Sequence, residues 1–144
     1  MGIKEDLAAA KERVADRVKT PEIPVVVGGK THVLVFFRAE PLEWSTVTLK
    51  HPPREGIALD RQNGYDIAGV SRAVSVSLGR FVEDGTEVEL SAEEWADFWD
   101  VVPPATGRLI EANVWALHEH DDEQEVGAAK KGSTPRSSSR PKQS

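Results

Sequence analysis

The sequence predicts a mostly helical α+β fold: an N-terminal helix, one β-hairpin, further helices that end in an αα-hairpin, and a disordered C-terminal tail. Apolar residues recur at helical spacing in several segments, most regularly in residues 67–78. Val25-Val26-Val27 and residues 31–37 are β-branched runs on either side of Gly28-Gly29-Lys30, which is typical of a tight hairpin turn. After residue 118 large apolar residues almost disappear, so no core is expected there.

Residues 3–18 are predicted to form a helix on the surface of the protein. Charged residues separate its apolar positions, so the apolar stripe is narrow. The residues of this stripe are Ile3, Leu7, Ala10, Val14 and Val18. Thr20-Pro21 and Pro24 end the helical pattern, because proline lacks the amide proton that a helix interior requires.

A short helix is expected to begin after the hairpin. Pro41 can occupy the first turn of a helix, where a missing amide proton costs nothing. This helix must end by His51, since Pro52-Pro53 follows. Residues 54–63 are polar and are expected to be irregular, and the helix over residues 67–78 is expected to end at Gly79, which suits a helix C-terminus.

The last two predicted helices form the αα-hairpin. Ser91-Ala92-Glu93-Glu94 has the form of a capping box, in which a serine and a glutamate satisfy each other's backbone amides at a helix start. Pro103-Pro104 ends this helix, and Thr106 is expected to cap the next one. The apolar residues of the two helices are Trp95, Phe98, Trp99, Val102, Leu109, Ile110, Val114 and Leu117.

Composition divides the chain into a surface helix over residues 1–19, a folded domain over residues 20–118 and a tail over residues 119–144. The tail carries equal numbers of acidic and basic side chains, so the net charge of -6 belongs to the first 118 residues. An acidic body argues against nucleic-acid binding by the folded part. No apolar run approaches the roughly 20 residues that span a bilayer, and the N-terminus lacks the apolar stretch of a secretory signal, which predicts a cytosolic protein.

No motif predicts catalysis or a cofactor. Gly28-Gly29-Lys30-Thr31 resembles part of a phosphate-binding loop, but Pro24 stands where the first glycine is needed, so a hairpin turn is expected. Residues 118–123 contain metal-ligand types in consecutive positions without a partner cluster, which predicts a solvated helix end. The chain has no cysteine, and no serine lies in a nucleophile motif. We therefore expect a protein that is not an enzyme and holds no metal or cofactor.

The aromatic face of the C-terminal helices is the expected protein-binding surface. Four tryptophans occur in a small domain, and tryptophan is enriched at interface hot spots, although core packing is the alternative explanation. The residues predicted to bind a partner are Trp95, Phe98, Trp99, Leu109, Val114 and Trp115. The basic residues of the tail could serve as a weak nucleic-acid arm or as a solubilising end.

The order of several motifs resembles the tail assembly chaperones of long-tailed (siphovirus-type) actinobacterial phages, and the resemblance covers residues 25–117. In order, these motifs are Gly29-Lys30, Arg38 with Trp44, His51-Pro52-Pro53, Gly64-Tyr65-Asp66, Leu90-Ser91-Ala92-Glu93-Glu94-Trp95 and residues 109–113. The sequence departs from the family in the aromatic run from Trp95 to Trp99 and in lacking the asparagine often found at the Gly64-Tyr65-Asp66 position. Partner contacts therefore cannot be transferred residue by residue.

The resemblance implies a function in virion assembly in the host cytoplasm and absence from the mature virion. Its implied partners are the tape measure protein, the major tail (tube) protein, a longer frameshifted form of the chain itself, and further copies of the chain by self-association. Lys130, Lys131 and Gly132 mark the expected frameshift region. Two alternatives stay open: a structural virion protein, such as a head-to-tail connector or decoration protein, and a nucleic-acid-binding regulator that uses the basic tail.

Overall fold

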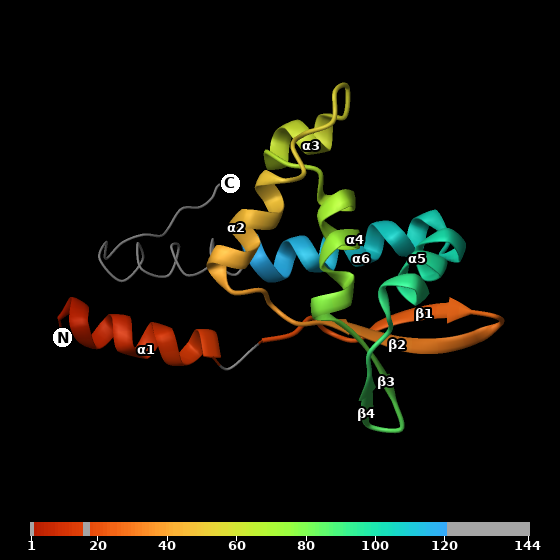
Figure 1. The fold of residues 1–144 in the computed structure, drawn as a ribbon, viewed down its shortest axis with the longest axis horizontal. Helices are drawn as coiled ribbons and strands as arrows, with labels where there is room; N and C mark the ends of the chain where they lie inside the picture. Colours follow the sequence, from red (N-terminus) through yellow and green to blue (C-terminus); the bar gives the residue numbers. More distant parts are fainter. Residues whose placement is uncertain (1, 16–17, 121–144) are drawn as a thin grey trace, which may run out of the picture.

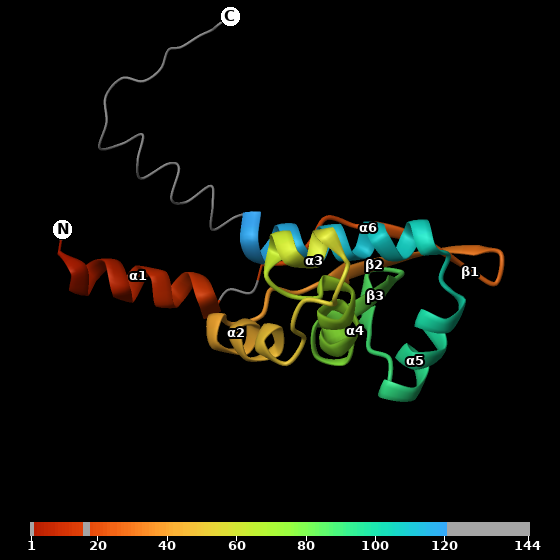
Figure 2. The same cartoon turned by 90° about the horizontal axis from the view of Figure 1, so that it is seen from above.

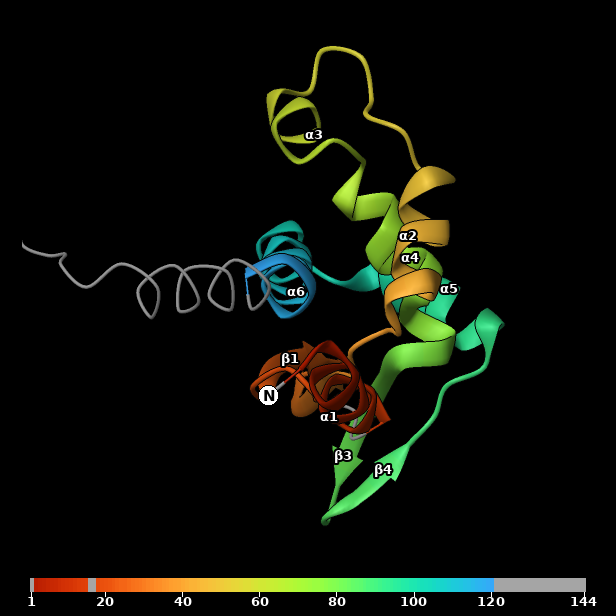
Figure 3. The ribbon, with the colours of Figure 1, turned by 90° about the vertical axis from the view of Figure 1, so that its left-hand side faces the viewer.

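The computed structural model describes residues 2–15 and 18–120, and it confirms the predicted α+β, mostly helical fold (Figure 1). One four-stranded antiparallel sheet lies beneath a group of helices, as Figures 1 and 3 show. The expected disordered tail lies outside the described residues from position 121 onward, as do Lys130, Lys131 and Gly132.

Two hairpins build the sheet, in the strand order β1-β2-β3-β4. Each turn has two residues at positive φ, Gly28 and Gly29 in the first (59° and 78°) and Asp84 and Gly85 in the second (52° and 76°). Such turns match the right-handed twist of the flanking strands. The sequence pattern predicts only the first hairpin; the second is found in the structure alone. The strands are β1 (Ile23–Val27), β2 (Lys30–Phe36), β3 (Gly79–Glu83) and β4 (Thr86–Val88).

The helices follow the predicted order with two differences. A short helix occupies part of the segment expected to be irregular, and Gly64 ends it in the left-handed conformation at φ 88°. The last long helix is capped at Pro103 and begins at Pro104, so the assignment of Thr106 as its cap is wrong. The helices are α1 (Ile3–Ala15), α2 (Pro41–Leu49), α3 (Ala58–Asn63), α4 (Ile67–Leu78), α5 (Ala92–Val101), α6 (Pro104–Trp115) and the π-helical turn η1 (Ala116–His120).

Helix α4 lies at the centre of the core. It packs against α2, α5 and α6, and its C-terminal end meets β3 (Figure 2). Val70, Val74 and Leu78 are buried at helical spacing, as the sequence predicts. Among the residues described, no helix combines the length and the apolar character needed to cross a membrane.

An ion pair holds the connection between α2 and α4. The buried carboxylate of Asp60 accepts hydrogen bonds from the backbone amide and Nε of Arg54, each at 2.8 Å, and from Nη2 at 3.1 Å. The Arg54 guanidinium lowers the pKa of Asp60, against the effect of burial. Asp66 caps α4 by accepting from the amide of Gly69, and it also lies 3.2 Å from Arg54 Nη2. The polar segment is therefore ordered by charge-assisted hydrogen bonds.

The last residues of the described chain are anchored to α2. The ring of His118 is buried and stacks on Trp44, with 3.8 Å between centroids, while its Nε2 accepts from the amide of Ala39 at 2.8 Å. Its Nδ1 lies 2.8 Å from the carbonyl oxygen of Val114, so the neutral ring with the proton on Nδ1 satisfies both contacts. The interpretation of residues 118–123 as a solvated helix end is therefore wrong for His118.

Glu119 extends the folded domain one residue further. Its Oε2 accepts hydrogen bonds from Trp44 Nε1 and from the Tyr65 hydroxyl, each at 2.8 Å. Burial raises the pKa of Tyr65, and the hydrogen bond to Glu119 and its charge act in the same direction. The sequence places the end of the folded domain at residue 118. Glu119 also belongs to the folded part, because two buried aromatic side chains use its carboxylate as a hydrogen-bond acceptor.

Candidate protein-binding groove

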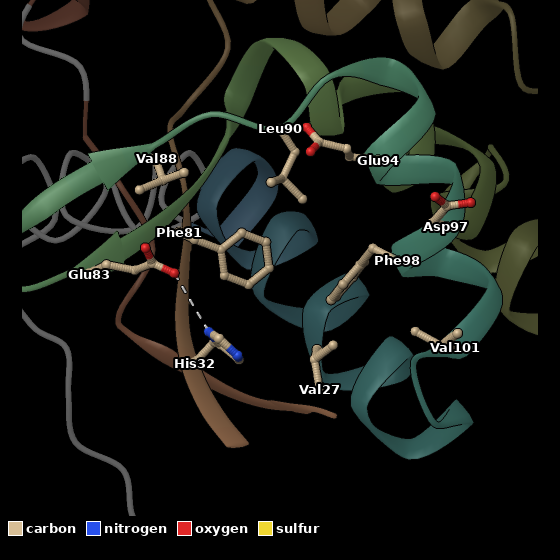
Figure 4. A pocket seen from close by; sticks show the side chains of 10 residues that line it. All are labelled: Val27, His32, Phe81, Glu83, Val88, Leu90, Glu94, Asp97, Phe98 and Val101. Carbon is tan, nitrogen blue, oxygen red and sulfur yellow. Dashed lines mark ion pairs between the residues drawn. The ribbon is translucent and has the colours of Figure 1, made fainter. Parts of the chain in front are cut away.

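An apolar groove of about 320 Å³ opens between the tips of the two hairpins and helix α5. Figure 4 shows side chains from the sheet and from α5 facing one another across it. Its apolar lining consists of Val27, Phe81, Val88, Leu90, Phe98 and Val101, and its polar lining of His32, Glu83, Glu94 and Asp97. Apolar groups therefore form the walls, and most of the charged groups come from acidic residues.

The sheet side of the groove follows from the strand register. Ile23, Leu34, Phe81 and Val88 are paired across all four strands, so they lie in one row on the same face. The helices cover this row at β1 and β2, where Ile23 and Leu34 are buried. Towards β4 and the hairpin tips the same face continues as the sheet side of the groove, opposite α5.

The α5 side is fixed by an aromatic cluster. Phe98 meets Phe81 edge to face at 5.7 Å and Trp95 at 5.2 Å, and Trp95 stacks on Phe81 at 5.6 Å. A Cβ on Gly79 would lie 2.6 Å from Trp95 Cζ2, so this glycine lets the indole approach β3. Packed aromatic pairs restrict one another's rotamers, so the groove is preformed.

Negative charge lies at the edge of the groove. Glu94 and Asp97 are one helical turn apart on α5, and Glu83 comes from the end of β3 on the other side. Glu94 Oε1 also accepts from the amide of Ser91, which confirms the predicted capping box. Glu83 Oε2 lies 3.8 Å from His32 Nδ1, across the two strands that form this side of the rim (Figure 4). The rim therefore favours a ligand with positive charge beside an apolar group.

The six residues predicted to bind a partner do not share one surface. Trp95 and Val114 are core residues at 2% and 0% exposure, so their assignment to a free binding face is wrong. Phe98 is buried but lines the groove. Trp99 turns towards α4, where its Nε1 donates to Ser75 Oγ at 3.0 Å.

The two remaining predicted binding residues lie on α6, outside the lining of the groove. Leu109 is exposed, and Trp115 packs partly buried against the core. The strand residues of the groove were not among the predicted binding residues. Their sequence signal is Asp84-Gly85, a typical hairpin turn between Phe81 and Val88.

The other candidate motifs have structural explanations. Gly28 and Gly29 form the hairpin turn that the sequence predicts instead of a phosphate-binding loop. Within residues 2–15 and 18–120, no three His, Asp or Glu side chains are placed to hold a metal ion. Asp121 and the acidic residues that follow it lie outside the described chain.

Comparison with protein-family models, with curated proteins and with solved structures found no match for this chain. The function is therefore inferred from the groove and from the sequence pattern. The preformed walls, the apolar lining and the acidic rim together describe a binding site for an apolar group that carries positive charge at its side.

Proposed function

We propose that this protein is a protein-binding assembly factor, and that it acts as a phage tail assembly chaperone that holds segments of the tape measure protein. The groove between α5 and the hairpin tips is the observation that carries the proposal. Its volume of about 320 Å³ suits one or two large apolar side chains of a partner. Burial of such side chains supplies roughly 25 cal/mol per Å² of apolar surface.

The character of the lining favours a protein segment over a small molecule. Small-molecule sites orient their ligands with a few converging polar groups inside the pocket. Here the polar groups lie at the rim, and three of the four, Glu83, Glu94 and Asp97, are carboxylates. An amphipathic helix with apolar anchors and flanking Lys or Arg residues matches both the lining and the rim.

The wider role follows from the sequence resemblance. The protein would coat the tape measure protein in the host cytoplasm, help to recruit tube subunits and be absent from the finished virion. A longer frameshifted form would carry the same groove, because the expected frameshift region follows the folded domain. A structural virion protein is the alternative, and it would be retained in purified particles.

Binding can be tested with overlapping peptides of the tape measure protein encoded in the same genome. Fluorescence titration of the four tryptophans should detect binding of basic amphipathic segments, with affinity falling as salt rises. Val101→Asp places a carboxylate on the exposed apolar wall and should weaken binding at least about tenfold. Leu49→Asp, an exposed leucine of α2 outside the groove, is the matched control and should bind normally.

Two results would overturn the proposal. One is equal binding by the Val101→Asp variant and the wild-type protein, which would exclude the groove. The other is the detection of the protein by mass spectrometry in purified virions at the level of a structural subunit, which would favour the alternative function.

A further inference from the structure

Ile3 and Leu7, the N-terminal part of the apolar stripe of helix α1, are not buried by any part of the described structure. Ile3 and Leu7 are 70% and 61% exposed. They lie four residues apart, so their side chains are neighbours on one face of the helix. In a chain of this size, two large apolar side chains on one exposed helical face mark a surface that gains free energy by being covered.

Positive charge lies along one side of this stripe. With about 100° of rotation per residue, Lys4 and Lys11 fall within roughly 20° of each other on the helix circumference, next to the side occupied by Leu7. Their spacing of seven residues places them about 10 Å apart along the helix axis. Glu5 and Glu12 fall on the opposite face, and Asp6 borders the stripe on the side away from the lysines, about 60° from Ile3.

The stripe and the groove are complementary in their apolar surface and in their charge. The groove offers apolar walls, including the 64% exposed Val101, and the carboxylates of Glu94 and Asp97 along one edge. The stripe offers apolar side chains with two lysines along one edge. Apolar side chains can pack on the apolar walls while the lysines lie beside the carboxylates, as when an amphipathic helix binds in a groove.

Helix α1 lies away from the groove of its own chain. Thr20 fixes the start of the folded domain at one end of β2, where its amide donates to the carbonyl of Phe36 and its Oγ1 accepts from the Phe36 amide. The groove lies at the opposite end of the sheet, at the hairpin tips (Figure 1). In this arrangement α1 does not reach the groove of its own chain.

We infer that the groove accepts α1 of a second copy of this chain, and that two copies exchange their α1 helices in a reciprocal dimer. Two identical contacts related by a two-fold axis close the assembly, whereas a single one would lead to open chains. The inference rests on the proposed function in one respect: α1 would occupy the groove until a tape measure segment displaces it. The dimer covers both apolar surfaces during the time in which no partner is bound.

Sedimentation velocity of the full-length chain, from about 1 µM to about 1 mM, tests the dimer. The wild-type protein should shift from monomer to dimer as concentration rises. Leu7→Asp and Val101→Asp should each weaken dimerisation at least about tenfold, and Leu49→Asp should leave it unchanged. An equimolar mixture of the Leu7→Asp and Val101→Asp variants should dimerise better than either variant alone, because one of the two contacts is then intact.

Disulfide crosslinking tests the contact itself. The chain contains no cysteine, so Leu7→Cys and Val101→Cys introduce single thiols. A mixture of these two variants should give a covalent heterodimer under oxidising conditions, since a disulfide needs Cβ atoms about 4 Å apart. Leu49→Cys mixed with Val101→Cys should not, which controls for random collision.

Three results would overturn the inference: a monomer at every concentration, a dimer that Leu49→Asp and not Leu7→Asp disrupts, or equal crosslinking in the control mixture. The proposed function is tested separately, because the Leu7→Asp variant keeps its groove and should bind tape measure peptides at least as well as the wild-type protein. If the wild-type protein binds none of the tape measure peptides while Leu7→Cys and Val101→Cys still crosslink, the proposed function alone is overturned.

Discussion

Replacing Glu119 tests whether the carboxylate anchors the end of the folded domain. Glu119→Ala removes the acceptor shared by Trp44 and Tyr65, both at 2.8 Å. A hydrogen bond to a charged group contributes about 1.5–3 kcal/mol, and the lower end applies here because one oxygen serves both donors and the contacts are only partly buried. We therefore expect the free energy of unfolding to fall by about 3 kcal/mol for Glu119→Ala and by about 1 kcal/mol for Glu119→Gln, which keeps an acceptor but loses the charge.

Urea unfolding at pH 7, followed by tryptophan fluorescence, measures these changes. A double-mutant cycle with Tyr65→Phe should give a coupling energy of about 1–1.5 kcal/mol between Tyr65 and Glu119. A change of less than about 0.5 kcal/mol for Glu119→Ala, within the range of ordinary surface substitutions, would refute the anchor.

The same pair predicts a dependence on alkaline pH. The pKa of Tyr65 is raised in the folded state, first by burial and then by its contact with Glu119. The protonated hydroxyl is therefore favoured by folding, so its stabilising contribution is complete below the unfolded-state pKa of about 10 and is lost as pH rises further. Tyr65→Phe should show a smaller loss of stability above pH 10 than the wild-type protein; an identical loss would contradict this role.

Three further substitutions test the remaining interactions. Asp60→Asn should cost about 2 kcal/mol at pH 7, and because Arg54 lowers the pKa of Asp60, this difference should shrink below pH 4 in urea titrations. Gly79→Ala should cost about 1–3 kcal/mol and change the near-ultraviolet circular dichroism of Trp95, since the new Cβ would overlap its ring. Glu111→Gln should raise the melting temperature at pH 7 but not at pH 4, because burial raises the pKa of Glu111 and disfavours its carboxylate in the folded state.

Local patterns were sufficient to predict the elements whose signals lie within one segment. The spacing of Val70, Val74 and Leu78 gave the extent of α4, and the capping box at Ser91 gave the start of α5. The hairpin β3–β4 was missed, because its strands are short and only Asp84-Gly85 marks the turn. A turn signal of two residues does not by itself predict the two short strands that flank it.

The groove could not be predicted, because it depends on which surfaces the tertiary structure covers. Helical spacing shows that Trp95 and Phe98 share a face, but it does not show whether that face meets solvent or the core. Phe81 and Val88 become part of a binding surface only through their pairing across β3 and β4. The role of Glu119 was missed for the same reason, since its donors lie 75 and 54 positions away in the sequence.

The anchored end of η1 also determines where any following polypeptide begins. Glu119 is held beside α2, at one end of α6, whereas the groove lies beside α5, which precedes the other end of the same helix (Figure 2). The described chain therefore ends at the opposite end of α6 from the groove. A label attached at His120 would thus leave the groove unobstructed.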